Sequence, residues 1–216
     1  MRQDLTQLVI ISDRSGSMSS SQEESQNAIN HLIDEQKKEE GECQLTFVEF
    51  DDSYDVVYDA GIKDAPQYFL MPRGMTALYD AVGRTINMVG EKLRNLPEAD
   101  RPALVQVVIS TDGLDNRSRE FSKSRVAQMI KRQRNEFSWQ FVFIGVEIDA
   151  ESIAVDLNIN INNAVKIKRS KSRDAYATTS NKMALGRRAV SAGLNAVDAE
   201  QLLAYAKVEK EELDSD

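Results

Sequence analysis

The chain has 216 residues, of which 41% are hydrophobic, and its formal net charge is -8. This length fits one large domain, and the apolar fraction is sufficient for a substantial core and too high for a disordered chain. The negative charge argues against non-specific binding to nucleic acid or to anionic membranes, because both require a basic surface.

Two features bear on the location of the protein. The single cysteine, Cys43, cannot form an internal disulfide, which suits a reducing compartment. The amino terminus does not read as a signal peptide, and no apolar run approaches the roughly 20 residues of a membrane-spanning helix. We therefore expect a soluble, cytoplasmic protein with no membrane contact.

Apolar runs of strand length alternate with segments of helical periodicity along most of the chain. In chain order, the expected strands cover residues 5–12, 44–50, 54–60, 103–111, 138–146 and 163–167. The expected helices cover residues 21–40, 78–93, 122–134 and 150–157, with a mostly helical remainder from about residue 172.

The clearest strands, residues 5–12 and 103–111, are apolar without alternation, which is typical of strands buried on both faces of a parallel sheet. We therefore expect an α/β fold: a three-layer, Rossmann-like, doubly wound sheet with helices on both faces. The sheet should be mostly parallel, with one antiparallel edge strand from the pair at 44–60. Near Asn195 the sequence becomes acidic and rich in Ala, so we predict one domain over 1–194 and an appended C-terminal helix and acidic tail over 195–216.

Oxygen-bearing side chains occur where the central strands are expected to end. Asp13, Ser15 and Ser17 follow the first strand at alternate positions. Asp112 follows the 103–111 strand, and Thr76 precedes a helix. Ligands of open α/β sheets bind beyond the carboxyl ends of the strands, so the loops that carry these residues can converge on one point. The absence of Cys and His among them favours Mg²⁺, Mn²⁺ or Ca²⁺ over zinc, copper or iron.

The sequence Asp13-x-Ser15-x-Ser17, followed by a distant Thr76 and a distant Asp112, resembles the metal-ion-dependent adhesion site of von Willebrand factor type A domains. The resemblance extends over most of the chain, which is similar to small stand-alone bacterial members. It implies that Ser15, Ser17 and Thr76 contact the metal directly or in a switchable way. Asp13 and Asp112 would act through water or directly, depending on the state of the site.

Two neighbouring segments support the same resemblance. Residues 74–78, Gly-Met-Thr-Ala-Leu, resemble the family's Gly-x-Thr-x-Leu, and residues 111–113 are its Thr-Asp-Gly. Because hydroxyl ligands are neutral, the cation would keep positive charge and attract a carboxylate from outside. In the family, an Asp or Glu of a partner protein completes the coordination, so the resemblance implies a metal-dependent protein-interaction module and not an enzyme. Small intracellular bacterial members often work beside ATPases or chaperone-like machines, which makes such a machine a candidate partner.

Two other functions use a similar sheet. A Mg²⁺-dependent phosphohydrolase of the haloacid-dehalogenase type would need a second aspartate where Ser15 stands, and a lysine beside the Asp112 turn that the sequence lacks. A flavodoxin-like cofactor binder would use residues 12–17 to cradle a phosphate. Asp13 would repel that phosphate, and Thr76 and Asp112 would then have no role.

Other conspicuous residues are expected to be structural. Cys43 and Trp139 should lie in or beside the core, and Asp115 should be a solvated turn residue. Arg14, at the variable position of the motif, either guides an acidic partner or faces solvent. The basic cluster at residues 166–173 should be a solvated face balanced by the acidic C-terminal segment.

Overall fold

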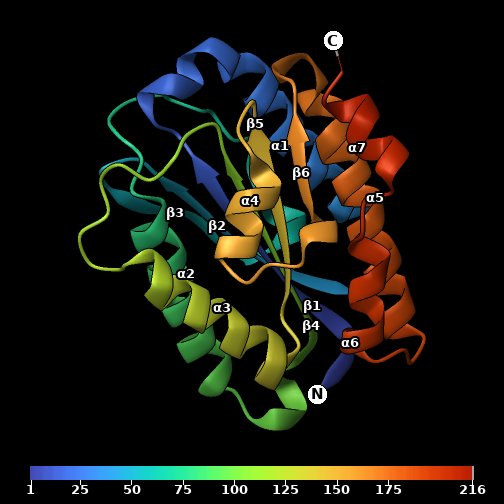
Figure 1. Cartoon of the computed structure of the whole chain (residues 1–216). Coiled ribbons are helices and arrows are strands. Elements are labelled where there is room, and N and C mark those ends of the chain that lie inside the picture. Colours follow the sequence, from blue (N-terminus) through green and yellow to red (C-terminus); the bar gives the residue numbers. More distant parts are fainter. Residues whose placement is uncertain (216) are drawn as a thin grey trace.

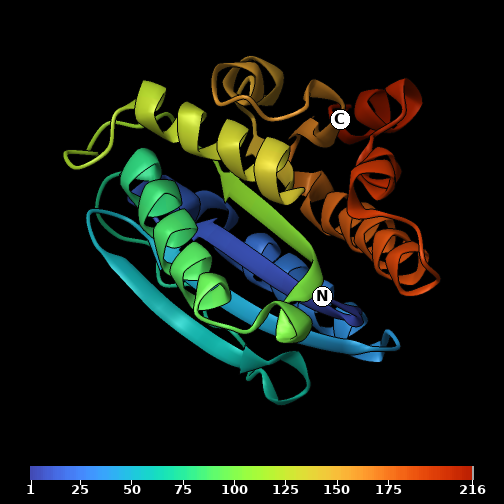
Figure 2. The ribbon, with the colours of Figure 1, turned by 90° about the horizontal axis from the view of Figure 1, so that it is seen from below.

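The structure is a computed structural model that describes residues 1–215, and it forms a six-stranded sheet with helices on both faces (Figure 1 and Figure 2). The strand order is β3-β2-β1-β4-β5-β6. Neighbouring strands pair in parallel, except for the antiparallel pair β2–β3 at one edge. The strands are β1 Arg2–Asp13, β2 Glu42–Phe50, β3 Tyr54–Gly61, β4 Pro102–Thr111, β5 Gln140–Val146 and β6 Ala164–Ile167. The predicted doubly wound sheet with one antiparallel edge strand is confirmed.

Helices occupy the segments where helical periodicity was found. They are α1 Gln22–Lys38, α2 Leu78–Arg94, α3 Lys123–Phe137, α4 Ala150–Asp156, α5 Ser172–Ser191, α6 Ala196–Ala199 and α7 Lys207–Leu213. Helices α1 and α5 share one face of the sheet, and α2, α3 and α4 cover the other (Figure 2). None of the helices among residues 1–215 is both long enough and apolar enough to cross a membrane.

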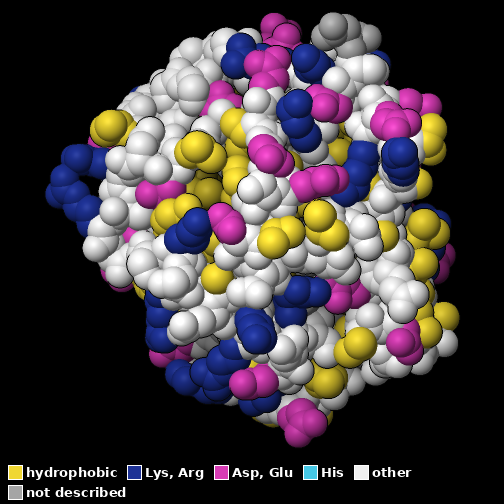
Figure 3. All heavy atoms as spheres, in the orientation of Figure 1, with side chains coloured by type: hydrophobic (Ala, Val, Ile, Leu, Met, Phe, Trp, Pro, Cys, Tyr) yellow, Lys and Arg dark blue, Asp and Glu magenta, His cyan; other side chains and the backbone are white. Residues whose placement is uncertain are grey.

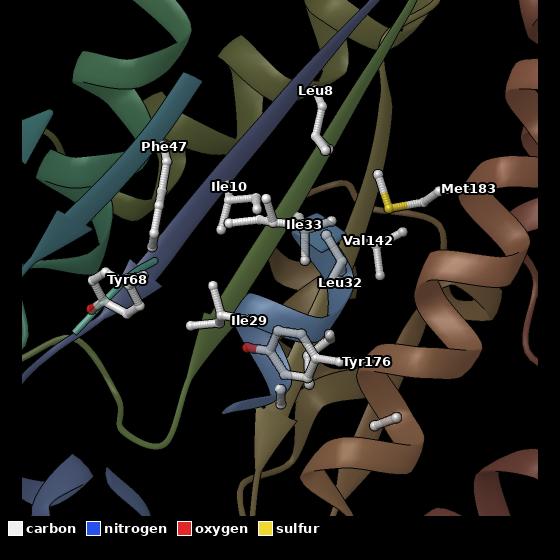
Figure 4. Packing of buried hydrophobic residues seen from close by; sticks show 14 of the residues in the cluster. Leu8, Ile10, Ile29, Leu32, Ile33, Phe47, Tyr68, Val142, Tyr176 and Met183 are labelled. Atoms are coloured by element: carbon white, nitrogen blue, oxygen red, sulfur yellow. The ribbon is translucent and has the colours of Figure 1, made fainter. Parts of the chain in front are cut away.

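The side chains of β1 divide the core into two layers. Leu8 and Ile10 point toward α1 and α5, whereas Val9 and Ile11 point toward α2 and α3. A strand with helices on both faces needs apolar residues at every position, which explains the run without alternation. Cys43 and Trp139 are also buried, as expected. Figure 4 shows the first layer, with labelled side chains including Ile29, Leu32 and Ile33 from α1 and Tyr176 and Met183 from α5.

The topology places the ends of β1 and β4 side by side. The two strands are parallel neighbours, and Ser12 is the register partner of Ser110. Asp13 is the last residue of β1, and Asp112 directly follows β4. Two of the predicted ligands therefore leave adjacent central strands at the same edge of the sheet.

The C-terminal segment differs from the single appended helix that was expected. Helix α6, a 3₁₀ segment at Glu200–Leu203 and α7 follow one another. Leu203, Tyr205 and Leu213 are buried in the same layer as α1 and α5. Residues two apart point to different sides of a helix, so one continuous helix could not bury both Leu203 and Tyr205.

The acidic end of the predicted C-terminal segment contains much of helix α7. The backbone carbonyl of Leu213 accepts a hydrogen bond of 2.9 Å from the amide of Lys168, just beyond β6. Helix α7 is thereby attached to the sheet edge. Asp216, the last residue of the predicted tail, lies outside the described residues, and the domain boundary after residue 194 stays a prediction.

Candidate metal centre

The loop after β1 is held on two sides by backbone hydrogen bonds. The amide of Arg14 donates to the carbonyl of Phe50 at the end of β2 (2.8 Å). The segment before Thr76 lies on the other side: the amide of Arg73 donates to the Arg14 carbonyl (2.8 Å), and the amide of Gly16 donates to the Gly74 carbonyl (3.1 Å). These contacts fix the loop against the segment that carries Thr76.

All five predicted ligands lie together. The hydroxyl oxygens of Ser15 and Ser17 are 3.0 Å apart, and the Ser17 hydroxyl donates to Oδ1 of Asp112 at 2.6 Å. The backbone amide of Ser15 donates to Oδ1 of Asp13 at 2.6 Å. A Cβ atom added to Gly113 would lie 3.3 Å from the Thr76 hydroxyl and 4.0 Å from that of Ser17, which places the Thr76 hydroxyl beside the same group.

Asp13 is a fully buried carboxylate whose two oxygens are both hydrogen-bonded. Oδ1 accepts from the Ser15 amide, and Oδ2 accepts from the Thr111 hydroxyl at 2.5 Å. Burial raises the pKa of Asp13 to about 6, and the hydrogen bonds from Thr111 and Ser15 oppose this shift. A cation next to Asp13 would favour its charged form.

Asp112 differs from Asp13 because one of its oxygens has no partner. Oδ1 accepts from Ser17, but Oδ2 is buried and makes no hydrogen bond within residues 1–215. Burial raises the pKa of Asp112, and the hydrogen bond from Ser17 opposes the shift. A buried carboxylate oxygen without a partner is costly, and a bound cation would supply that partner.

The donor atoms fit a hard divalent cation. They are two carboxylates and three hydroxyls, which is the oxygen chemistry that Mg²⁺ uses while retaining some of its waters. No group of three or more His, Cys, Asp or Glu side chains that could hold a metal occurs in the described part of the chain. Within residues 1–215, the hydroxyl-rich cluster is therefore the candidate site.

The sequence did not reveal the roles of three residues that shape the site. Thr111 orients Asp13, as described above. Asn116 binds both backbone groups of Thr76: its side-chain oxygen accepts from the Thr76 amide at 2.9 Å, and its own backbone amide donates to the Thr76 carbonyl at 3.0 Å. Asp80 accepts hydrogen bonds of 2.7–2.9 Å from the three amides of residues 119–121. Thr111 was noted in the sequence only as part of the Thr-Asp-Gly segment, and the other two residues act across distant segments.

Both expectations for Arg14 are wrong. Its side chain is buried and forms ion pairs with Glu49, Asp51 and Asp55 of β2, β3 and the turn between them. The loop lies against the end of β2, so the variable position of the motif points into this group of carboxylates. Arg14 thus neither faces solvent nor meets a partner.

Asp115 is also not a solvated turn residue. Its carboxylate accepts hydrogen bonds from the Tyr79 amide at 3.1 Å, in the first turn of α2, and from Ser118. One member of the basic cluster is balanced as expected, because Lys166 Nζ lies 3.1 Å from Oδ2 of Asp214 in the acidic C-terminal segment, whereas Arg169 pairs with Glu147.

No protein-family model matches the sequence, and no curated protein is similar to it by sequence. Similar solved structures include a von Willebrand factor type A protein from Catenulispora acidiphila, with 12% identity and a TM-score of 0.57 over 83% of this chain and 43% of that one. A second is proximal thread matrix protein 1 from the mussel byssus with a zinc-occupied adhesion-site motif, at 16% identity and a TM-score of 0.56 over 86% of this chain and 46% of that one. A third is the manganese-loaded TRAP protein of Plasmodium vivax, at 13% identity and a TM-score of 0.55 over 81% of this chain and 72% of that one. The chain spans less than half the length of the first two, and these similarities establish the fold.

Proposed function

We propose that this chain, which has the fold of von Willebrand factor type A domains, holds a divalent cation and uses it to bind an acidic side chain of a partner protein. The ligands would be Asp13, Ser15, Ser17, Thr76 and Asp112. The observation that supports this most directly is Oδ2 of Asp112, which is buried and has no hydrogen-bond partner within residues 1–215. A cation at this position would remove the cost of that unpaired oxygen.

The ligand set also supports a role in binding a carboxylate. Ser15, Ser17 and Thr76 offer neutral oxygens, so they leave the charge of a cation uncompensated. Both oxygens of Asp13 are already engaged by Thr111 and by the Ser15 amide. A carboxylate from another protein would supply the negative charge that this set provides only in part.

The metal we propose is Mg²⁺, with Mn²⁺ or Ca²⁺ as the alternatives. All are hard cations that prefer oxygen ligands. Two of the solved structures with a similar fold contain a divalent metal, zinc in the mussel protein and manganese in the Plasmodium protein, which supports a divalent cation here.

We propose a binding function and not catalysis. A phosphohydrolase would use Asp13 as a free nucleophile, but both of its oxygens accept hydrogen bonds. Ser15 stands where the general acid would be needed. A flavodoxin-like site would place a phosphate next to the buried carboxylate of Asp13, which would repel it.

The partner class and the location are further parts of this proposal. We propose an ATPase or a chaperone-like machine as the partner and the cytoplasm as the location. The first follows from the resemblance to small intracellular bacterial members of the family. The second is supported by Cys43, which is a free, buried thiol.

Affinity capture tests the proposal. The wild-type chain should retain a partner in MgCl₂ and release it in chelator, and Asp13→Ala should not retain it. Asp100→Ala is the matched control, because Asp100 is exposed and directly precedes Arg101 and β4. It therefore lies at the amino-terminal end of that strand, opposite to the end that carries the candidate ligands. Equal retention by the wild type and Asp13→Ala, or equal retention with and without Mg²⁺, would contradict the proposal.

A further inference from the structure

Four large apolar side chains are exposed on the two segments that border the metal centre. Phe69, Met71 and Met75 belong to the segment before Thr76, and Leu114 follows Gly113. Their exposed fractions are 71%, 72%, 45% and 66%. Figure 3 shows hydrophobic side chains at the surface in the upper left of the view, where Figure 1 places these segments.

Met75 and Leu114 are immediate neighbours of the candidate ligands. Met75 precedes Thr76, and Leu114 is separated from Asp112 only by Gly113. The two segments are close at Gly113 and Thr76: if Gly113 carried a Cβ atom, that atom would lie 3.3 Å from the Thr76 hydroxyl. These two apolar side chains therefore flank the position where a partner carboxylate would arrive.

The exposure of Phe69 and Met71 is built into the fold. Leu70 between them is buried, and its backbone is fastened to α1: its amide donates to Gln26 Oε1 at 3.0 Å, and its carbonyl accepts from Gln22 Nε2 at 2.7 Å. With Leu70 pointing inward, its two neighbours point outward. A surface that exposes several large apolar side chains is a candidate interaction site.

We propose that these four side chains and the metal centre form one docking surface for an extended segment of a partner protein in which an Asp or Glu is flanked by large apolar residues. This rests on the function proposed above and specifies its partner. A cation held by the buried, unpaired oxygen of Asp112 and by the neutral hydroxyls would select for the carboxylate at the centre. The exposed apolar side chains select for its neighbours, because contact between apolar surfaces adds affinity and methionine adapts to varied partners.

A peptide library tests the proposal directly, because it varies the residues beside a central carboxylate one at a time. The probe is a set of immobilised seven-residue peptides with a central Glu, in which each flanking position is fixed in turn to Leu, Phe, Ser or Asp. In MgCl₂, the wild-type chain should bind peptides with Leu or Phe flanks about tenfold more tightly than those with Ser flanks, as expected for burying one such side chain. Replacing the central Glu by Gln, or adding chelator, should abolish the binding.

The double variant Met75→Ser, Leu114→Ser separates this inference from the proposed function. It should lose the preference for apolar flanks and keep the Mg²⁺-dependent preference for Glu over Gln. The matched control is Val197→Ser, because Val197 is 61% exposed and lies on α6, whose Ala196 carbonyl accepts from Gln140 at the opposite end of β5. The control should bind like the wild type.

Two results would overturn the inference. One is Mg²⁺-dependent binding of Glu peptides without any preference among flanks, and the other is an unchanged preference in the double variant. Either would leave the proposed metal-dependent binding standing. The absence of any Mg²⁺-dependent preference for Glu over Gln would instead contradict the proposed function, and the inference with it.

Discussion

Asp13 and Asp112 are similar in sequence context but differ in how their buried oxygens are satisfied. Asp13 accepts hydrogen bonds on both oxygens, from the Ser15 amide and from Thr111. Asp112 accepts one bond from Ser17 and leaves Oδ2 unpaired. Asp13 therefore shapes the loop, and Asp112 presents the oxygen that is available to a cation.

Thr111→Val tests the shaping role of Asp13. Valine keeps the volume but removes the hydrogen bond to Asp13 Oδ2, so we expect a loss of about 1–3 kcal/mol in the free energy of unfolding. We also expect Mg²⁺ affinity to fall about 10- to 100-fold, as for residues that orient metal ligands. Urea unfolding and calorimetric titration measure the two effects.

Thr85→Val is the matched control for this variant. Thr85 is buried in α2 and donates to the Ala81 carbonyl at 2.7 Å, away from the metal centre. It should lower stability without changing Mg²⁺ affinity. Thr111→Val with wild-type Mg²⁺ affinity would contradict the role given to Asp13.

The candidate ligands were predictable because each lies in a loop after an apolar strand or before a helix. The local sequence is sufficient to recognise such positions. The surroundings were not predictable in the same way. Arg14 is buried with Glu49, Asp51 and Asp55, which belong to the β2–β3 hairpin, and Asp115 is held by the first turn of α2. Such contacts depend on how distant segments pack.

At the scale of elements, a group of ion pairs connects the loop after β1 to the turn between β2 and β3 and to the segment before Thr76. Asp51, at the turn between β2 and β3, pairs with Arg14 of the loop and, at 2.8 Å, with Arg73 of the segment before Thr76. Burial disfavours the charged form of Asp51, but hydrogen bonds from Ser53 and Arg73 and the charge of Arg14 outweigh it and lower the pKa to about 2. The three segments are thus joined by one carboxylate.

Asp51→Asn tests this connection through its pH dependence. Because the folded-state pKa of Asp51 is below its ordinary value, its contribution to stability is complete at neutral pH and is lost as the pH falls from about 4 toward 2. We expect the variant to be about 2 kcal/mol less stable than the wild type at pH 7, with a difference that shrinks below pH 4. Denaturant unfolding at several pH values measures this.

Asp100→Asn is the control, because Asp100 is exposed, and it should show no such difference in stability. A stability difference between Asp51→Asn and the wild type that stays constant down to pH 3 would contradict the assignment.

At the scale of the whole molecule, most of the fold could be predicted from the sequence. Apolar runs and helical periodicity were sufficient to predict the alternating elements and the parallel sheet, and the solved structures confirm the fold. The C-terminal segment was not predictable, because Leu203, Tyr205 and Leu213 reach the core without a common period, from a 3₁₀ segment, from the loop after it and from α7. Packing against α5 decides their positions, as in the 2.5 Å contact between the hydroxyls of Tyr205 and Thr179.

Removal of residues 195–216 tests the predicted domain boundary. The shortened chain should still unfold cooperatively and bind Mg²⁺, because none of the candidate ligands lies in the removed segment. It should lose about 3–6 kcal/mol in stability, since three large side chains no longer cover the core. Calorimetric unfolding and Mg²⁺ titration measure these properties. A shortened chain without a cooperative transition would contradict the boundary, and unchanged stability would contradict the importance of the buried contacts.

Calorimetric titration of Mg²⁺ into the wild-type chain and into Asp112→Asn tests the central claim most directly. We predict that the wild type binds one Mg²⁺ per chain and is stabilised by it against thermal unfolding. The variant should bind none, and without metal it should be at least as stable as the wild type, because a neutral amide replaces a half-buried carboxylate that has one buried, unpaired oxygen. A wild-type chain that binds neither Mg²⁺ nor Mn²⁺, or a variant that binds Mg²⁺ with unchanged affinity, would contradict the account.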